Sequence, residues 1–180
     1  MKILLILFLS LNIYASVKQD ILNLFQNKKY EDACNIGFDN FARYTKDEEY
    51  LSIYAFSCLK ADYIDRLALP IAMLKFSQES RSNSAYFSVI FMQKKLLYHA
   101  LLDDYDLSEF NLPTTDYVLS KVFELYAKLG KHNKRTLYIF DDTSNEKISY
   151  KLYLEKDYKI PKMVIEEYYD TILIKRHIYW

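Results

Sequence analysis

The chain has 180 residues, of which 51% are hydrophobic, enough to fill the core of one compact domain and to exclude intrinsic disorder. Lys and Arg together number 24, as do Asp and Glu, so no basic surplus drives binding to nucleic acid. With only two glycines, the chain lacks a glycine-rich phosphate loop of the P-loop or dinucleotide-binding type.

Residues 1–15 have the pattern of a secretory signal peptide. Lys2 precedes an uninterrupted apolar run over residues 3–9, and Ala15 supplies a small residue for cleavage. This run is too short to cross a hydrocarbon layer of about 30 Å. A buried first helix is the alternative interpretation. We expect export to a bacterial periplasm, with a mature chain that starts near Ser16 and has no membrane span.

Residues 16–130 are predicted to form a helical domain, because apolar side chains recur at steps of three and four. The predicted helices cover residues 17–28, 30–44, 45–60, 64–78, 83–102 and 114–130. Thr45 with Glu48 predicts a capping box for the third helix, and Thr114 an N-cap for the sixth. Pro70 lacks an N–H, so the fourth helix is predicted to begin late, near Leu69, or to bend there.

Residues 131–180 are predicted to be rich in β-structure. Residues 135–141 and 147–155 flank the turn-prone residues 142–145, which indicates a hairpin. Residues 171–180 alternate similarly, whereas residues 163–169 fit a strand or a helix, with the strand favoured. The expected fold class is therefore α+β, with N-terminal antiparallel helical hairpins followed by a small C-terminal antiparallel sheet.

The two cysteines are predicted to pair. If the second and third helices form an antiparallel hairpin that turns near Lys46, Cys34 and Cys58 lie twelve residues on either side of the turn. They then stand at the same height, and an oxidising compartment favours a disulfide. The alternative is two buried free thiols. The absence of a C-x-x-C motif argues against a redox enzyme.

Two stretches of the sequence have a similar pattern of residue types. Residues 61–68, ADYIDRLA, resemble the turn and second-helix start of a tetratricopeptide repeat, and residues 27–33, NKKYEDA, are similar. Ala33 precedes Ala68 by 35 residues, close to the 34-residue period of that family. Gly37 stands where the family has a bulky aromatic residue. Over residues 17–78 the resemblance implies a stack of helical hairpins, and such repeats bind peptides or proteins. A plain helical bundle is the alternative.

One face of the third helix is a candidate binding surface. Tyr50, Ile53, Ser57 and Lys60 follow one another at three, four and three residues and so share a face. In a tetratricopeptide-like hairpin the leading helix lines the concave side, so this face is expected to be open. The alternative is that Tyr50 and Ile53 belong to the core.

No metal site is predicted. Asp104, Asp106 and Ser108 mimic the first ligands of a calcium loop, but Glu109 and Thr115 occupy the positions that require glycine and a bidentate glutamate. The three histidines, His99, His132 and His177, have no ligand spacing.

No catalytic set is predicted either. His99 and Asp103, one turn apart, are typical of a surface hydrogen bond. Glu166 and Glu167 would point to opposite faces of a strand, so they cannot act as paired carboxylates. We therefore expect no cofactor.

These patterns favour an exported, non-enzymatic interaction or scaffold module of the cell envelope, such as an accessory part of a flagellar motor. Its partner would be another envelope protein or a peptide. The second hypothesis is a small periplasmic ligand-binding protein or enzyme with a pocket between helices and sheet. A cluster of His, Asp, Glu or Ser around a concave pocket would favour the second hypothesis, and an exposed Tyr-rich groove the first.

Overall fold

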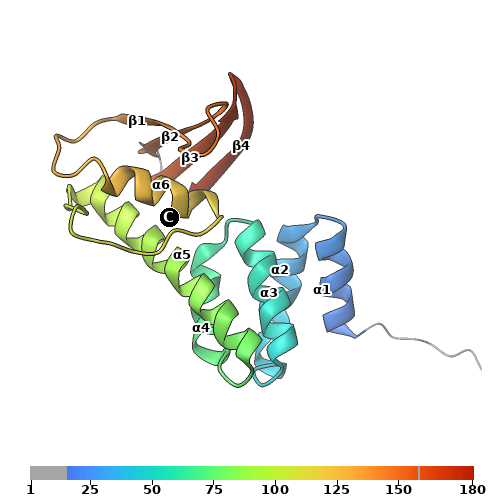
Figure 1. Ribbon diagram of the computed structural model, residues 1–180. Coiled ribbons are helices and arrows are strands. Elements are labelled where there is room, and N and C mark those ends of the chain that lie inside the picture. Colours follow the sequence, from blue (N-terminus) through green and yellow to red (C-terminus); the bar gives the residue numbers. More distant parts are fainter. Residues whose placement is uncertain (1–15, 158) are drawn as a thin grey trace, which may run out of the picture.

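A computed structural model describes residues 16–157 and 159–180, and the predicted signal peptide lies outside them. The described chain has a helical region followed by a four-stranded antiparallel sheet, which confirms the α+β class (Figure 1). The helices are α1 Val17–Gln26, α2 Tyr30–Asn40, α3 Glu48–Lys60, α4 Ala68–Met73, α5 Gln78–Asp103 and α6 Val118–Ala127, with 3-10 turns η1 Phe41–Arg43 and η2 Ile64–Leu67. The strands are β1 Leu137–Asp141, β2 Ile148–Glu155, β3 Lys162–Tyr169 and β4 Ile172–Tyr179. In the described part of the chain, no helix combines the length and apolarity needed to cross a membrane.

Helices α1, α3 and α5 begin in the same way. Each has a polar N-cap residue whose side chain accepts a hydrogen bond from the amide three residues later, which satisfies one of the free N–H groups of the first turn. These N-caps are Ser16, Asp47 and Ser77.

Helices α1 and α3 also end in turns of the same type. Lys28 and Asp62, 34 residues apart, both adopt left-handed backbone conformations, with φ of 60° and 65°. The amide of the next residue donates to the carbonyl five residues before it, from Lys29 to Leu24 and from Tyr63 to Cys58, both at 2.9 Å. The local structure therefore repeats with a period of 34 residues.

This period corrects the alignment of the two stretches by one residue. A shift of 34 places Ala33 level with Leu67, and both are fully buried, whereas Ala68 is exposed. The predicted spacing of 35 residues, from Ala33 to Ala68, is one residue longer than the 34-residue spacing of the turns. The 3-10 turn η2, which occupies the start of the second unit, replaces the α-helical turn found there in the first unit.

Three predicted helix starts differ from the structure. Asp47, not Thr45, caps α3, because its carboxylate accepts the Tyr50 N–H at 3.0 Å. Helix α6 begins at Val118, and the Thr114 hydroxyl binds Glu124 instead of capping it.

Helix α5 starts at Gln78, five residues before the prediction. Helix α4 ends at Met73 and not at residue 78. It begins at Ala68, so the predicted late start beside Pro70 is confirmed.

The predicted disulfide is confirmed. Cys34 of α2 and Cys58 of α3 are bonded, with their Cα atoms 4.7 Å apart. Gly37, one turn further along α2, allows the same close approach, because a Cβ atom there would lie 2.9 Å from Cγ of Tyr54. The two helices are thus held together by a covalent bond and by a small residue at their contact.

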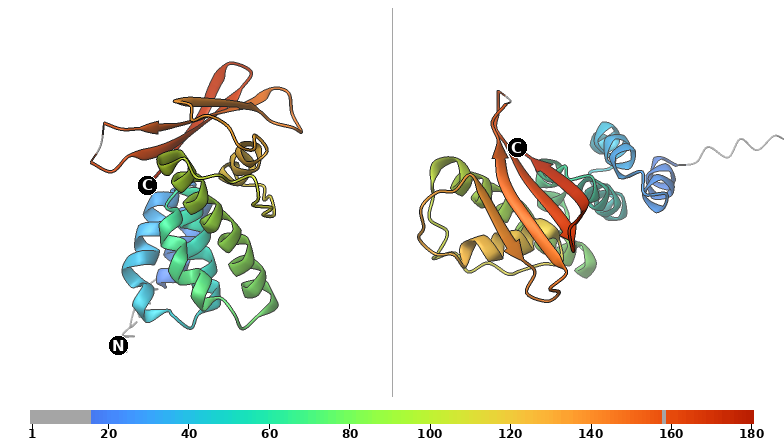
Figure 2. Two further views of the ribbon diagram at one scale, coloured as in Figure 1. Left: turned by 90° about the vertical axis from the view of Figure 1, so that its left-hand side faces the viewer. Right: turned by 90° about the horizontal axis from the view of Figure 1, so that it is seen from above.

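The sheet has the strand order β1-β2-β3-β4, and residues 163–169 fall within strand β3, as favoured. One face packs on α5 and α6 and carries buried side chains from all four strands: Tyr138, Phe140, Tyr150, Leu152, Met163, Ile165, His177 and Tyr179. The other face exposes aliphatic side chains such as Ile139 and Ile174. Figure 2 shows the sheet as a layer across one end of the helical region, with α6 beneath it in the view from above.

Candidate functional site

The predicted binding face of α3 is not open along its length. Tyr50 and Ser57 are completely buried, Ile53 is half-buried and Lys60 is exposed. The Tyr50 hydroxyl donates to the Gly37 carbonyl at 2.7 Å, and its ring stacks on Tyr44. The prediction was therefore wrong for Tyr50 and Ser57. Helix α3 is packed between neighbours on two sides, which buries a wide arc and leaves only a narrow strip free.

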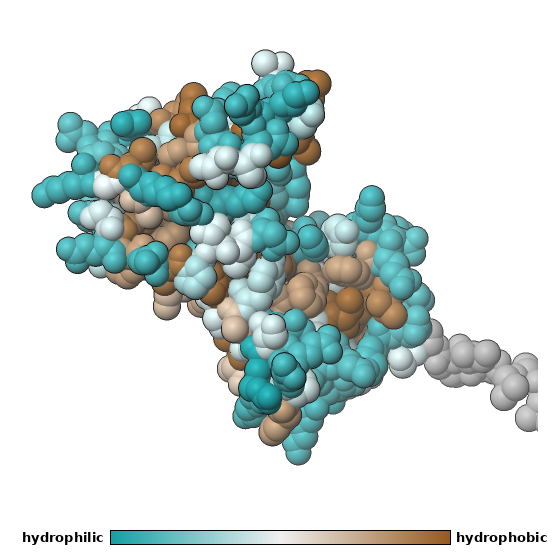
Figure 3. Space-filling model, in the orientation of Figure 1, coloured by the Kyte–Doolittle hydropathy of each residue, from teal (hydrophilic) through white to brown (hydrophobic). Residues whose placement is uncertain are grey.

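The open strip of α3 lies about one residue from the predicted one. Glu49, Ser52, Ile53 and Phe56, related by steps of three and four, line a groove of about 900 Å³. Residues of α1 and α5 complete its walls, so the groove runs across α1, α3 and α5, the three helices with the same type of N-cap. Figure 3 shows hydrophobic side chains gathered over the helical region near α1 and α3, with hydrophilic side chains around them.

The charges of this groove are mostly carboxylates. Asp47, Glu48, Glu49 and Glu79 face only Lys18 and Lys46, which leaves a formal charge of −2 (two lysines minus four carboxylates). Lys18 lies 3.2 Å from Asp47 and 2.8 Å from Glu49, so it bridges α1 to the start of α3.

Glu48 has a structural task at the edge of the groove. Its carboxylate accepts the backbone N–H groups of Lys75, Phe76 and Ser77 at 2.7–2.9 Å, which fixes the turn that leads into α5. Burial opposes ionisation of Glu48, but these three amides outweigh it and lower its pKa to about 2.

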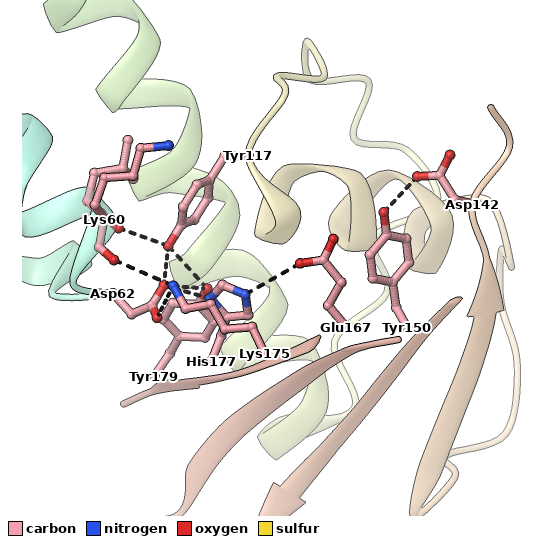
Figure 4. A network of polar contacts seen from close by, with 10 residues as sticks. Lys60, Asp62, Tyr117, Asp142, Tyr150, Glu167, Lys175, His177 and Tyr179 are labelled. Carbon is pink, nitrogen blue, oxygen red and sulfur yellow. Dashed lines mark hydrogen bonds and ion pairs between the residues drawn. The ribbon is translucent and has the colours of Figure 1, made fainter. Parts of the chain in front are cut away.

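A second polar site lies where the helices meet the sheet (Figure 4). At its centre is Asp62, in the left-handed turn after α3, a conformation that aspartate tolerates. Its carboxylate accepts hydrogen bonds from His177 Nδ1 at 2.7 Å and from the Tyr117 hydroxyl at 2.5 Å. Lys175 lies 3.2 Å away, and the Tyr179 hydroxyl is at 3.4 Å. One residue of the turn after α3 thus contacts three side chains of strand β4.

The charges in this site stabilise one another. Burial opposes ionisation of Asp62, but His177, Lys175 and Tyr117 outweigh it, so the pKa of Asp62 lies below its ordinary value. Burial likewise opposes protonation of His177, but Asp62 and Glu167 outweigh it and raise the pKa of His177 above 6.5. His177 is therefore an imidazolium between two carboxylates at mildly acidic pH.

The two nitrogens of His177 differ in their surroundings. Nδ1 is bonded to Asp62, whereas Nε2 is buried and has no hydrogen-bond partner. The Glu167 carboxylate lies 4.0 Å from Nε2, beyond hydrogen-bonding distance. Glu167 therefore faces Nε2 as an ion-pair partner and not as a hydrogen-bond acceptor.

A cavity of about 180 Å³ adjoins this histidine. It is lined by side chains from the end of α3, the start of α6 and the inner face of the sheet: Lys60, Lys121, Lys175, His177, Asp116 and Glu167. Lys60, predicted as part of the α3 binding face, therefore lines this cavity and not the groove. The combination of an imidazole, ammonium groups and carboxylates suits recognition of a small polar molecule.

The remaining candidate residues lie apart from both sites. His99 and Asp103 form an exposed 2.8 Å contact, which confirms a surface interaction. Glu166 and Glu167 occupy opposite faces of β3, as expected: Glu166 accepts from Tyr153 at 2.9 Å, and Glu167 lines the cavity. Among residues 16–157 and 159–180, no group of three or more His, Cys, Asp or Glu side chains is placed to hold a metal ion.

Sequence reasoning missed the site around Asp62. Alternation along the last strand places Lys175, His177 and Tyr179 on one face, but their carboxylate partner lies 115 residues from His177 in the chain. No protein-family model, no curated protein and no solved structure matches this chain, so both sites are interpreted from their own geometry.

Proposed function

We propose that this protein is an exported, non-enzymatic interaction or scaffold module of the bacterial cell envelope, and that its groove binds a segment of another envelope protein. The observation that carries this proposal is the groove of about 900 Å³ across α1, α3 and α5. A chain segment laid along these three helices would bury the exposed lining of the groove.

The repeated helix ends support the family resemblance behind this proposal. The turn geometry that recurs after 34 residues, at Lys28 and Asp62, is what a pair of tetratricopeptide-like units would have. In such a stack the leading helices line the concave surface. Helices α1, α3 and α5 are the leading helices here, and they are the ones that line the groove.

The lining of the groove indicates the chemistry of the partner segment. Ile53 and Phe56 offer apolar surface, and the surrounding carboxylates exceed the lysines by two. A segment that carries apolar side chains together with Lys or Arg would complement both features.

Export is supported by the disulfide. Cys34 and Cys58 form a disulfide. Disulfides persist in oxidising compartments such as the periplasm and are rare in the cytosol. The apolar leader over residues 1–15 points the same way.

The test is capture of partners from the native envelope by the tagged mature protein, with variants matched in chemistry. Ile53→Lys places a cation in the groove, and Leu69→Lys places one on α4, where Leu69 is exposed outside the groove. We expect the partner to be lost with Ile53→Lys and retained with Leu69→Lys, and its capture to weaken with added salt. Equal capture by both folded variants would rule out the groove.

A second candidate function is a small-ligand-binding protein with its pocket between helices and sheet. The specific observation in its favour is the His177–Asp62–Glu167 cluster beside the 180 Å³ cavity. This is the feature expected for that hypothesis, and the groove contains no cluster of tyrosines. The groove remains the better-supported binding surface, because the paired side chains of the cluster also have a structural task in joining β4 to α3.

A further inference from the structure

Strand β1 is an open edge of the sheet, because it pairs with β2 on one side and stands last in the strand order. The amide of Asp142 donates to the carbonyl of Ile148, the residue opposite it, so the hydrogen-bonded pairs with β2 fall at the even-numbered residues of β1. The backbone groups of Leu137, Ile139 and Asp141 therefore point away from β2. In the described part of the chain, these outward groups have no hydrogen-bond partner.

Apolar side chains accompany these outward backbone groups. Leu137 and Ile139 are 41% and 63% exposed on the outer face of the sheet. They belong to the same residues whose N–H and C=O groups face the open edge. A strand that paired here would therefore gain backbone hydrogen bonds and also cover aliphatic surface.

The opposite edge strand, β4, is protected against such pairing, whereas β1 is not. Strand β4 carries Lys175 and Arg176, and its pairing with β3 is interrupted by a bulge beside Glu167 and Tyr168. Charged side chains and bulges are devices that keep an edge strand from pairing with another chain. The pairing of β1 with β2 is regular throughout, and the strand LYIFD contains no lysine, arginine or proline.

The charges at the two ends of β1 indicate which strand would fit. Asp141 ends the strand, Arg135 lies two residues before its start, and both are exposed. The Arg135 guanidinium lies 5.8 Å from the ring centre of Tyr138, and within the described residues neither Arg135 nor Asp141 forms an ion pair. An antiparallel strand of the same sequence would bring its basic start to the acidic end of β1, and its acidic end to the basic start.

We propose that β1 pairs antiparallel with β1 of a second copy of this chain, about a two-fold axis at Ile139. In this register Ile139 faces its own counterpart and Leu137 faces the counterpart of Asp141, so all the outward residues enter hydrogen-bonded pairs. Arg135 lies one diagonal step from the second copy's Asp141, which gives two equivalent ion pairs. The two sheets become one continuous sheet, and the symmetry closes the assembly at a dimer. This inference goes beyond the proposed function and does not depend on the groove.

The experiment is sedimentation equilibrium of the mature protein over a range of concentrations, with variants matched in chemistry. We expect a monomer–dimer equilibrium with a dissociation constant in the micromolar range. Ile139→Lys places two cations opposite each other at the axis and should raise this constant at least about tenfold. Ile174→Lys makes the same change at an exposed position of β4 and should leave the constant unchanged.

The end charges test the register. Asp141→Arg alone should weaken dimerisation about tenfold, because it brings two cations together at each end of the pairing. Adding Arg135→Asp should restore the dimer, since the two ion pairs then form with reversed sign.

Amide exchange measured residue by residue gives a second readout. The amides of Leu137, Ile139 and Asp141 should exchange more slowly only at concentrations that favour the dimer. The amides of Tyr138 and Phe140 point toward β2 and should be protected at all concentrations.

Several outcomes would overturn the proposal. These are a protein that stays monomeric at about 0.5 mM, an equal effect of Ile139→Lys and Ile174→Lys in folded protein, or no recovery on adding Arg135→Asp. A monomer that loses an envelope partner on Ile139→Lys would also overturn it, because β1 would then pair with a strand of a different protein. Ile53→Lys should leave the dimer intact, so dimerisation and partner capture by the groove can fail separately.

Discussion

Reducing the Cys34–Cys58 disulfide should lower the unfolding free energy by an amount set by the loop it closes. The two cysteines are 24 residues apart, and the chain-entropy estimate for a loop of that length is about 3.5 kcal/mol at 25 °C. For a chain of this size that corresponds to a fall in Tm of about 7–14 °C. Reduction keeps both sulfur atoms in the core, so the comparison isolates the cross-link from loss of buried volume.

Urea unfolding with and without a phosphine reductant measures this difference. The Cys34→Ala/Cys58→Ala variant is the control, since its unfolding free energy should not respond to reductant. The oxidised protein should show no reactive thiol in denaturant, because the chain contains only these two cysteines. A reductant effect below about 1 kcal/mol in protein shown to be oxidised would refute the loop-entropy reasoning.

Three further outcomes follow from other contacts. Gly37→Ala should destabilise the fold, because overpacking against Tyr54 costs about 1–3 kcal/mol, more than the gain in helix propensity of about 1 kcal/mol. An unchanged free energy of unfolding in urea would contradict this. Glu48→Gln should speed amide exchange at residues 75–77, whereas Glu49→Gln, at an exposed position, should not. The pKa of His177 is raised on folding, so its contribution to stability is complete below pH 6.5 and is lost as the pH rises through the folded pKa. His177→Gln should abolish this decline in unfolding free energy with pH. The same pH dependence in both proteins would contradict the ion-pair assignment.

Local patterns predicted most of the fold. Helical spacing identified the order of the helices, and equal distances from a turn near Lys46 identified the disulfide, because both depend on geometry within a single hairpin. The start of α3 was misplaced because Thr45 and Asp47 are both good N-cap residues, and only the structure shows which side chain reaches the Tyr50 amide. Period-two alternation correctly divided the strands into two faces.

The candidate sites were less predictable, since they depend on contacts between distant segments. Ile53 does line the groove, but Tyr50 and Ser57 are buried because α2 and the helices after α3 cover neighbouring arcs of the same helix. Aromatic and small polar residues do not reveal from sequence which side of a central helix is covered. The pairing of Asp62 with His177 joins the end of α3 to the last strand, a contact that no local pattern indicates.

The most direct test of the proposed groove is photo-crosslinking in the native envelope from a single benzophenone side chain. Placed at position 53, in the groove, it should give one dominant adduct with another envelope protein; placed at position 69, on exposed α4 surface, it should not. Addition of Lys-rich and apolar peptide should suppress the adduct from position 53, because it would compete for the acidic groove. Equal adducts from positions 53 and 69, or none from position 53 in protein shown to be exported and folded, would contradict the account.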